Sequence, residues 1–190
     1  YVNYLGNIVQ GDFGVSLRYR EPALNLFTQR FPASLELLGA SVALSLLVGI
    51  PAGIIAAMRR GKAVDSIVMA FALLGQAVPA FYLGLMLMLF FSVQLGWLPT
   101  GGRGTLAQLI MPTFVLGAYL MALTARMTRS SLLETFGRDY IRTARAKGLA
   151  QRVIVYKHAL KPALIPIITV VGLQVGTLFS GAVVTETVFS

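Results

Sequence analysis

Long apolar stretches alternate with more polar segments along this chain. Four stretches without Asp, Glu, Lys or Arg are long enough to cross a membrane, because a helix needs about 20 residues to span a hydrocarbon core of roughly 30 Å. The segment 42–50 shows no strand-like alternation of polarity, so helices are expected rather than a β-barrel. Pro79 in the second stretch predicts a tilted or bent helix. The expected spans are 37–58, 66–95, 105–126 and 162–185.

Basic residues fall mainly in two of the connections between these spans. The segment 59–65 carries three Lys and Arg against one Asp, and 126–161 carries nine against two acidic residues. Residues 1–36 carry three of each sign. Loops rich in Lys and Arg stay on the cytoplasmic side. We therefore expect cytoplasmic loops at 59–65 and 127–161, and outer segments at 1–36 and 96–104.

The composition agrees with a membrane protein. Of 190 residues, 56% are hydrophobic and only 12% are charged, about half the share in soluble domains. This excludes a disordered tail and a water-soluble enzyme, and the absence of Cys excludes a disulfide scaffold. The net charge of +9 lies at helix ends and in loops, where lipid head groups are neighbours. Without an aromatic-lined basic groove, no nucleic-acid partner is expected. Because the first residue is Tyr1, we interpret the chain as a piece of a longer protein.

The segment 126–161 has a helical pattern of its own. Four apolar residues recur at every fourth position, which predicts one stripe on a helix that continues the third span. Gly148 after Lys147 is typical of a helix end, and a second short helix is expected over 151–159. The segment is long for a connection. An amphipathic helix pair on the membrane surface and a docking element for another protein both remain open. The four stripe residues are Leu132, Phe136, Tyr140 and Ala144.

Residues 139–149 resemble the "EAA" loop of ABC importer permeases of the dipeptide, oligopeptide and nickel class. Their sequence is Asp-Tyr-Ile-Arg-Thr-Ala-Arg-Ala-Lys-Gly-Leu. The stretches 11–16, 96–99 and 186–189 resemble the same group, so the resemblance covers essentially the whole chain. Arg142-Thr143-Ala144 stands where the wider superfamily has Glu-Ala-Ala, and Gly148 fits that pattern. His158 replaces its Ile, and Lys161 replaces its Pro.

This resemblance implies an all-α membrane protein with the type I ABC importer transmembrane fold. Such a chain would be a non-catalytic permease subunit without a cofactor, in a bacterial inner membrane, importing peptides, nickel or related small solutes. Its implied partners are cytoplasmic ATP-binding subunits, a second permease subunit of identical or homologous sequence, and an extracytoplasmic substrate-binding protein. The loop 126–161 would carry a coupling helix that docks on the ATPase. The residues implied in coupling are Asp139, Arg142, Thr143, Ala144, Arg145, Ala146, Lys147, Gly148 and Leu149.

A few residues inside the predicted spans are candidates for special roles. Gln76 and Gln174 suit either an interhelical hydrogen bond or the lining of a translocation path. Pro79 is a third candidate for the path. Gly172 and Gly176 have the four-residue spacing of closely packed helices, for which packing is a simpler interpretation than substrate contact.

Other functions fit the sequence less well. An ion-coupled secondary transporter usually holds ionisable residues at mid-membrane, whereas the four apolar stretches contain none. An intramembrane hydrolase needs Ser and His at depth, but His158, the only histidine, lies in the basic loop, and no GxSxG motif occurs. Without a second ligand nearby, His158 suits packing or docking better than metal binding. No GxxxxGK[ST] motif occurs, so ATP should bind another subunit. A non-transporting scaffold stays open.

Overall fold

The computed structural model describes residues 6, 13–16, 20–102 and 104–189. The chain divides into two compact units, 1–36 and 37–190. In the first unit an antiparallel bridge joins Val15 to Pro22, and the amide N–H of Ser16 donates to the carbonyl of Glu21 at 2.9 Å. Helix α2 begins directly afterwards, at Ala23. The expected outer segment 1–36 is therefore partly helical, which the span limits predicted from charge-free runs missed.

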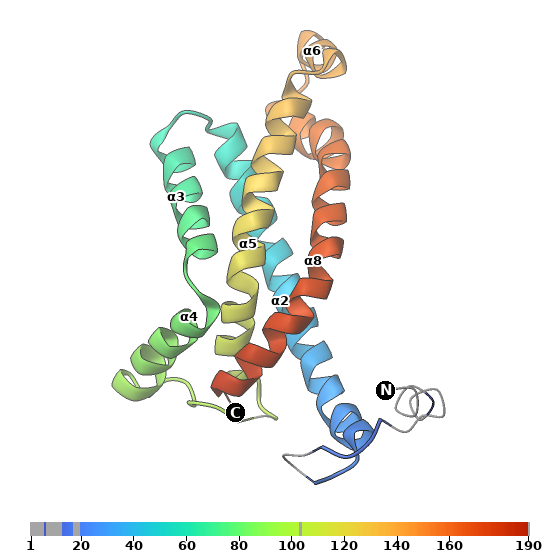
Figure 1. Ribbon diagram of the computed structural model, residues 1–190. Coiled ribbons are helices and arrows are strands. Elements are labelled where there is room, and N and C mark those ends of the chain that lie inside the picture. Colours follow the sequence, from blue (N-terminus) through green and yellow to red (C-terminus); the bar gives the residue numbers. More distant parts are fainter. Residues whose placement is uncertain (1–5, 7–12, 17–19, 103, 190) are drawn as a thin grey trace. The chain divides into compact units, whose positions relative to one another are not determined.

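Helices form nearly all of the described chain, as expected for an all-α membrane protein. Three of them are long and apolar enough to cross a membrane, and a bent pair makes a fourth crossing if it is counted as one span. Beyond the single bridge, the described residues form no strand. The elements (Figure 1) are α2 (Ala23–Met58), α3 (Ala63–Ala77), α4 (Ala80–Leu87), the π-helix η1 (Met88–Gln94), α5 (Leu106–Phe136), α6 (Asp139–Ala146), α7 (Gln151–Val153), the π-helix η2 (Ile154–Ala159) and α8 (Leu160–Phe189).

The predicted second span, 66–95, is not one continuous helix. Its α3 and α4 portions meet at a bend of 104° around Pro79. Val78 and Pro79 both have extended backbone conformations. Proline lacks an N–H and disfavours helical geometry in the residue before it, so α3 ends here. A bend at Pro79 was expected, but the break is far sharper than a kinked span, and α4 turns away from the direction of α3 (Figure 1).

The third predicted span continues beyond its apolar run, as expected. Helix α5 extends without interruption from Leu106 to Phe136, ten residues past the predicted end at 126. Its first turn is held by a capping box, in which the amide N–H of Thr105 donates to Oε1 of Gln108 at 3.0 Å. One long helix therefore connects the turn at 96–104 with the basic segment at the other end of the unit (Figure 1).

Helices α2 and α5 approach each other along a row of small residues on α2. A Cβ atom placed on Gly53 would lie 2.5 Å from both the carbonyl oxygen of Ala125 and Cβ of Thr128. Because real Cβ atoms do not come so close, only glycine fits this contact. Small residues allow such backbone-to-backbone packing between helices in lipid. The row, buried throughout, consists of Ser41, Ser45, Gly49, Gly53 and Ala57.

The glycine pair singled out in the sequence, Gly172 and Gly176, lies in a different environment. Both glycines are exposed, and no described atom lies within 4 Å of a Cβ placed on either one. Ile165 and Ile168 of α8 are also exposed, by 69% and 62%. The close helix contact expected at this pair is thus absent within the described chain. A close contact of this kind occurs on α2, between glycines with the same spacing, and packing of Gly172 and Gly176 on another helix stays a prediction.

The apolar core of the second unit lies between α2, α5 and α8. Its buried side chains come from all three helices, so each of them loses lipid contact on one face. The two basic connections, between α2 and α3 and around α6, lie at the same end of this unit, and the turn after η1 lies at the other end (Figure 1). The core residues are Leu37, Leu38, Leu116, Leu120, Ile167, Val171, Leu178 and Ala182.

Candidate functional site

The most distinctive local structure is the elbow formed by α6 beyond the end of α5 (Figure 1). Two residues separate the helices, and the second, Arg138, has an extended backbone (φ −73°, ψ 147°). This break contradicts the single stripe expected over 132–144. Leu132 is buried as predicted, but Tyr140 is 47% exposed and Ile141 is buried in its place. The break reorients α6 relative to α5, so the four-residue spacing does not continue across it.

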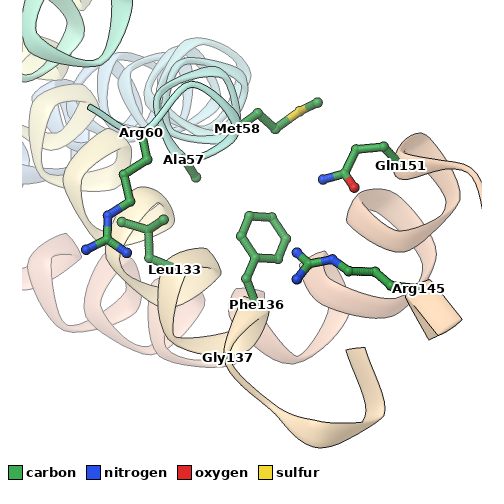
Figure 2. A pocket seen from close by; sticks show the side chains of 8 residues that line it. All are labelled: Ala57, Met58, Arg60, Leu133, Phe136, Gly137, Arg145 and Gln151. Atoms are coloured by element: carbon green, nitrogen blue, oxygen red, sulfur yellow. The ribbon is translucent and has the colours of Figure 1, made fainter. Parts of the chain in front are cut away.

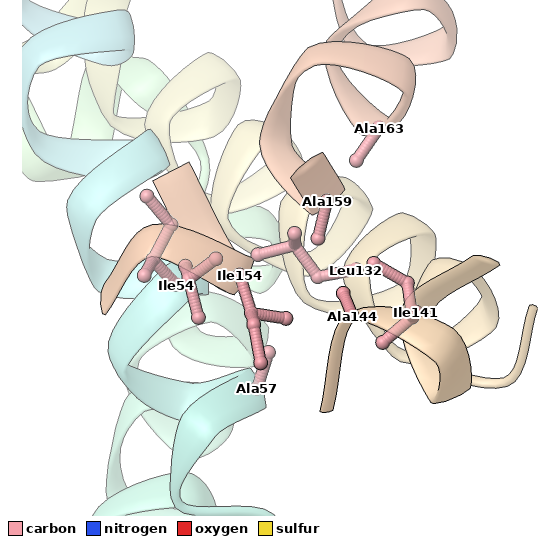
Figure 3. Close-up of a cluster of buried hydrophobic side chains, with 9 residues drawn as sticks. Ile54, Ala57, Leu132, Ile141, Ala144, Ile154, Ala159 and Ala163 are labelled. Carbon is pink, nitrogen blue, oxygen red and sulfur yellow. The ribbon is translucent and has the colours of Figure 1, made fainter. Parts of the chain in front are cut away.

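A cluster of buried apolar side chains fastens α6 to the bundle (Figure 3). Ile141 and Ala144 of α6 pack with Leu132 of α5 and with side chains of α2, η2 and α8. Burial of an isoleucine side chain is worth about 1.5–3 kcal/mol. We conclude that α6 is part of the packed end of the bundle rather than a free loop. The members are Ile54, Ala57, Leu132, Ile141, Ala144, Ile154, Val155, Ala159 and Ala163.

The other face of α6 is polar and exposed. Within it, the Thr143 hydroxyl donates to the carbonyl of Asp139 at 3.1 Å, and Nη1 of Arg142 lies 3.5 Å from Oδ1 of Asp139. Ala144 faces the bundle instead, which makes it an anchor. Of the residues predicted to couple, the exposed ones are Asp139, Arg142, Thr143, Arg145, Ala146, Lys147, Gly148 and Leu149.

Gly148 ends α6 in the way the sequence predicted. Its φ is +74°, a left-handed conformation that favours glycine. The amide N–H of Gly148 donates to the carbonyl of Arg145 at 2.9 Å, and that of Leu149 to the carbonyl of Ala144 at 3.3 Å. These two bonds make a Schellman motif. No described atom lies within 4 Å of a Cβ placed on Gly148, so glycine is needed here for conformation and not for space.

A buried ion pair connects the other basic connection to α5. Nε and Nη2 of Arg129 donate to the two carboxylate oxygens of Asp65 at 2.6 and 2.8 Å. The side chain of Asp65 is 7% exposed and that of Arg129 is 27% exposed. Asp65 also accepts a hydrogen bond from the amide N–H of Gly61 at 3.0 Å. From the sequence alone, Asp65 and Arg129 look like ordinary loop charges. The signal that could have found the pair is a single acid in an otherwise basic connection.

The three candidates for a translocation path lie on different elements. Gln76 of α3 accepts a hydrogen bond from Nη1 of Arg126 of α5 at 2.7 Å, the interhelical bond that was one of its two interpretations. Gln174 accepts one from the Thr177 hydroxyl at 2.7 Å within α8. Pro79 is exposed at the break between α3 and α4. The hydrogen bonds do not join the two glutamines to each other.

The described residues around α6 include no candidate metal site. Among the described residues, no group of three or more His, Asp or Glu could hold a metal ion. His158, in η2, is partly buried. What this region presents is an exposed basic helix on a packed support.

Comparison with known proteins gives consistent matches. Residues 49–190 match the family described as "Binding-protein-dependent transport system inner membrane component". The di/tripeptide transport system permease protein of Pseudomonas aeruginosa (strain UCBPP-PA14) is 44% identical, over the whole of this chain and 65% of the relative. The dipeptide transport system permease protein of Escherichia coli (strain K12) is 39% identical with the same coverage. The glutathione transport system permease protein of E. coli (strain K12) is 44% identical over 99% of this chain and 61% of the relative.

The chain thus spans slightly less than two thirds of the length of these relatives. The resemblance seen at residues 139–149 extends over the whole sequence, and it is confirmed.

Proposed function

This chain belongs to the family of binding-protein-dependent transport inner membrane components, and from this premise we propose that it is a permease subunit of an ATP-driven importer. It contributes helices to the translocation path and carries no catalytic site of its own. Small peptides are its proposed substrate class, because relatives at 39–44% identity bear the names of dipeptide, di/tripeptide and glutathione permeases. Nickel and related small solutes are the alternative substrates.

The observation that carries this proposal is the short connection between α5 and α6. Helix α5 crosses the unit from Leu106 to Phe136, and only two residues separate it from α6. The buried cluster around Ile141 joins α6 to α2, α5, η2 and α8. A force applied to the exposed face of α6 would therefore reach several membrane helices together.

The proposed mechanism follows from this connection. Cytoplasmic ATP-binding subunits grip the exposed face of α6, and their closure on ATP moves the elbow as one piece. The helices packed on it rotate, which shifts the path from inward-open to outward-open. A second permease subunit completes the path, and a substrate-binding protein delivers solute from outside. In this proposal the loops 59–65 and 127–161 lie in the cytoplasm, and the chain lies in the bacterial inner membrane.

The secondary-transporter alternative lacks a comparable element. A coupling ion needs an ionisable group within the path, whereas the one buried ion pair between described residues joins Asp65, in the first turn of α3, to Arg129 of α5. A basic helix packed on the end of the bundle, with one face exposed, suits protein docking better.

The test uses Gly148 in the full-length permease, assembled with its partner subunits in proteoliposomes. Gly148→Leu forces a branched side chain into a left-handed conformation, at a cost of about 1–2 kcal/mol, and should reduce ATP-dependent uptake of a labelled dipeptide at least tenfold. Gly148→Asn introduces a side chain of similar size that tolerates this conformation, so uptake should remain within about twofold of the wild type.

The control is Gly61→Leu. Gly61 has a φ of +75°, and it too has open space around a placed Cβ, but it lies in the connection between α2 and α3. The Gly61→Leu variant should retain clearly more uptake than Gly148→Leu and bind the ATP-binding subunits normally. Equal loss at Gly61 and Gly148, or full uptake by Gly148→Leu, would contradict the coupling role of α6.

A further inference from the structure

A hollow with mixed chemistry lies beside the elbow, on the side where α2 ends (Figure 2). Its volume is about 360 Å³. Side chains from α2, α5, α6 and α7 and from the connection after α2 surround it, so it forms where these elements meet. The lining residues are Ala57, Met58, Arg60, Leu133, Phe136, Gly137, Arg145 and Gln151.

Two arginines line this hollow, and no acidic residue does. Cζ of Arg145 lies 5.9 Å from the centroid of the Phe136 ring. Arg60 comes from the connection after α2, where the nearby carboxylate of Asp65 is already held by both nitrogens of Arg129. Within the described part of the chain, neither Arg60 nor Arg145 donates to a carboxylate. The site therefore has unused donors for an anion.

The remaining walls are apolar. Met58, at the end of α2, is 44% exposed, and Leu133 and Phe136 are only partly buried. Figure 2 shows the Phe136 ring between the side chains of Leu133 and Arg145, with the amide of Gln151 directed into the same space. An occupant that matches this lining carries negative charge and apolar surface at once.

We propose that this hollow binds the head group of an anionic phospholipid. Guanidinium groups match phosphate oxygens well because they donate two parallel hydrogen bonds. Basic pockets between membrane helices on the cytoplasmic side suit such head groups. The hollow lies at the ends of α2 and α5, two of the helices long enough to cross a membrane, so the head group of a lipid is an anion that this position suits. The glycerol and first methylenes then cover Met58 and Leu133.

An acidic segment of an ATP-binding subunit fits the hollow less well. It would use the two arginines but leave the apolar wall uncovered, and the exposed face of α6 already offers it basic residues. A bound lipid joins Arg60 to Arg145 and so links the end of α2 to the coupling helix. The inference depends on the membrane-embedded fold and not on the transported substrate.

The test measures lipid binding to the full-length permease in its assembled complex. The detergent-purified complex is titrated with dioleoylphosphatidylglycerol or dioleoylphosphatidylcholine, and bound lipids are counted by native mass spectrometry. Arg60→Gln and Arg145→Gln should each weaken binding of the anionic lipid about tenfold, as expected for the loss of a hydrogen bond to a charged group, and leave phosphatidylcholine binding unchanged. Arg60→Lys and Arg145→Lys should retain an intermediate affinity, which separates charge loss from misfolding.

The controls remove the same charge next to the hollow. Arg59→Gln and Arg152→Gln each neutralise an exposed arginine that does not line it, and they should bind the anionic lipid like the wild type. Equal weakening by these controls would reveal a general charge effect and overturn the proposal. Equal affinity of the wild type for the two lipids would also overturn it. The same holds if Arg60→Gln and Arg145→Gln lose the ATP-binding subunit while their lipid binding stays unchanged.

Discussion

Two glycine pairs with the same four-residue spacing have opposite environments in this chain. On α2, Gly49 and Gly53 face α5 so closely that a Cβ would overlap it. On α8, Gly172 and Gly176 face open space, next to exposed isoleucines. The spacing shows that a helix can approach there, but it does not specify which helix. The first pair is used within the chain, and the second is available to a helix outside the described residues.

The two sides of the second unit differ in the contacts that their helices make. Where α2 and α3 meet α5, small residues, a buried ion pair and an interhelical hydrogen bond hold the helices together. On the outward face of α8, the hydrogen bonds described stay within the helix. We therefore expect substitutions on the first side to affect folding and those on the second to affect assembly with the proposed second permease subunit.

The largest effect is expected from Gly53→Val. The added carbons overlap the carbonyl of Ala125 and the side chain of Thr128, so α2 must move away from α5, at a cost of about 3 kcal/mol or more. Thermal unfolding of the detergent-solubilised full-length permease would measure it. Gly172→Val is the matched control and should change the melting temperature little. Equal stability of the two variants would contradict the difference in packing between Gly53 and Gly172.

A smaller effect is expected from Asp65→Asn. Loss of the charge leaves Arg129 without its carboxylate partner, and a hydrogen bond to a charged group is worth about 2 kcal/mol. The same unfolding measurement applies. Glu134→Gln removes the carboxylate of an exposed i,i+4 pair with Arg138, and such pairs contribute less than about 1 kcal/mol. If Glu134→Gln proved as destabilising as Asp65→Asn, burial would not account for the strength of the α3–α5 contact.

The smallest effect on folding, but a clear one on assembly, is expected from Gly176→Ile. The open face of α8 accepts the side chain without a clash inside this chain. A neighbouring helix that packs on this face would be pushed away, so pairing with the second permease subunit should weaken severalfold. Size-exclusion chromatography with light scattering would measure the paired fraction. Unchanged pairing would show that the second subunit binds elsewhere.

The sequence predicted those features that depend on local chemistry. Uninterrupted apolar runs indicated where long helices lie, because lipid requires the backbone to form its hydrogen bonds internally. They did not give the start of α2 at Ala23 or the sharp break at Pro79. The end of α6 at Gly148 followed from the conformational freedom of glycine. The extension of α5 to Phe136 followed from the absence of a helix breaker.

Features that depend on distant residues were missed or misplaced. The partner of Gly53 lies more than 70 residues away, on α5, so spacing alone could not distinguish it from Gly172. Arg129 and Asp65 are 64 residues apart and looked like two ordinary loop charges. The reorientation of α6, with Ile141 buried instead of Tyr140, depends on the backbone of the two residues between α5 and α6, of which Arg138 is extended. Hydrophobic periodicity carries no information about such a break.

The break at Pro79 has a consequence for water. Helix α3 has 15 residues, so the break lies about 22 Å along the helix axis from Ala63. There the last carbonyls of α3 and the first amides of α4 lack intrahelical partners. Bare hydrocarbon cannot solvate such groups. These groups therefore need hydrogen-bond partners from neighbouring helices, side chains or water, a need that a straight helix would not create.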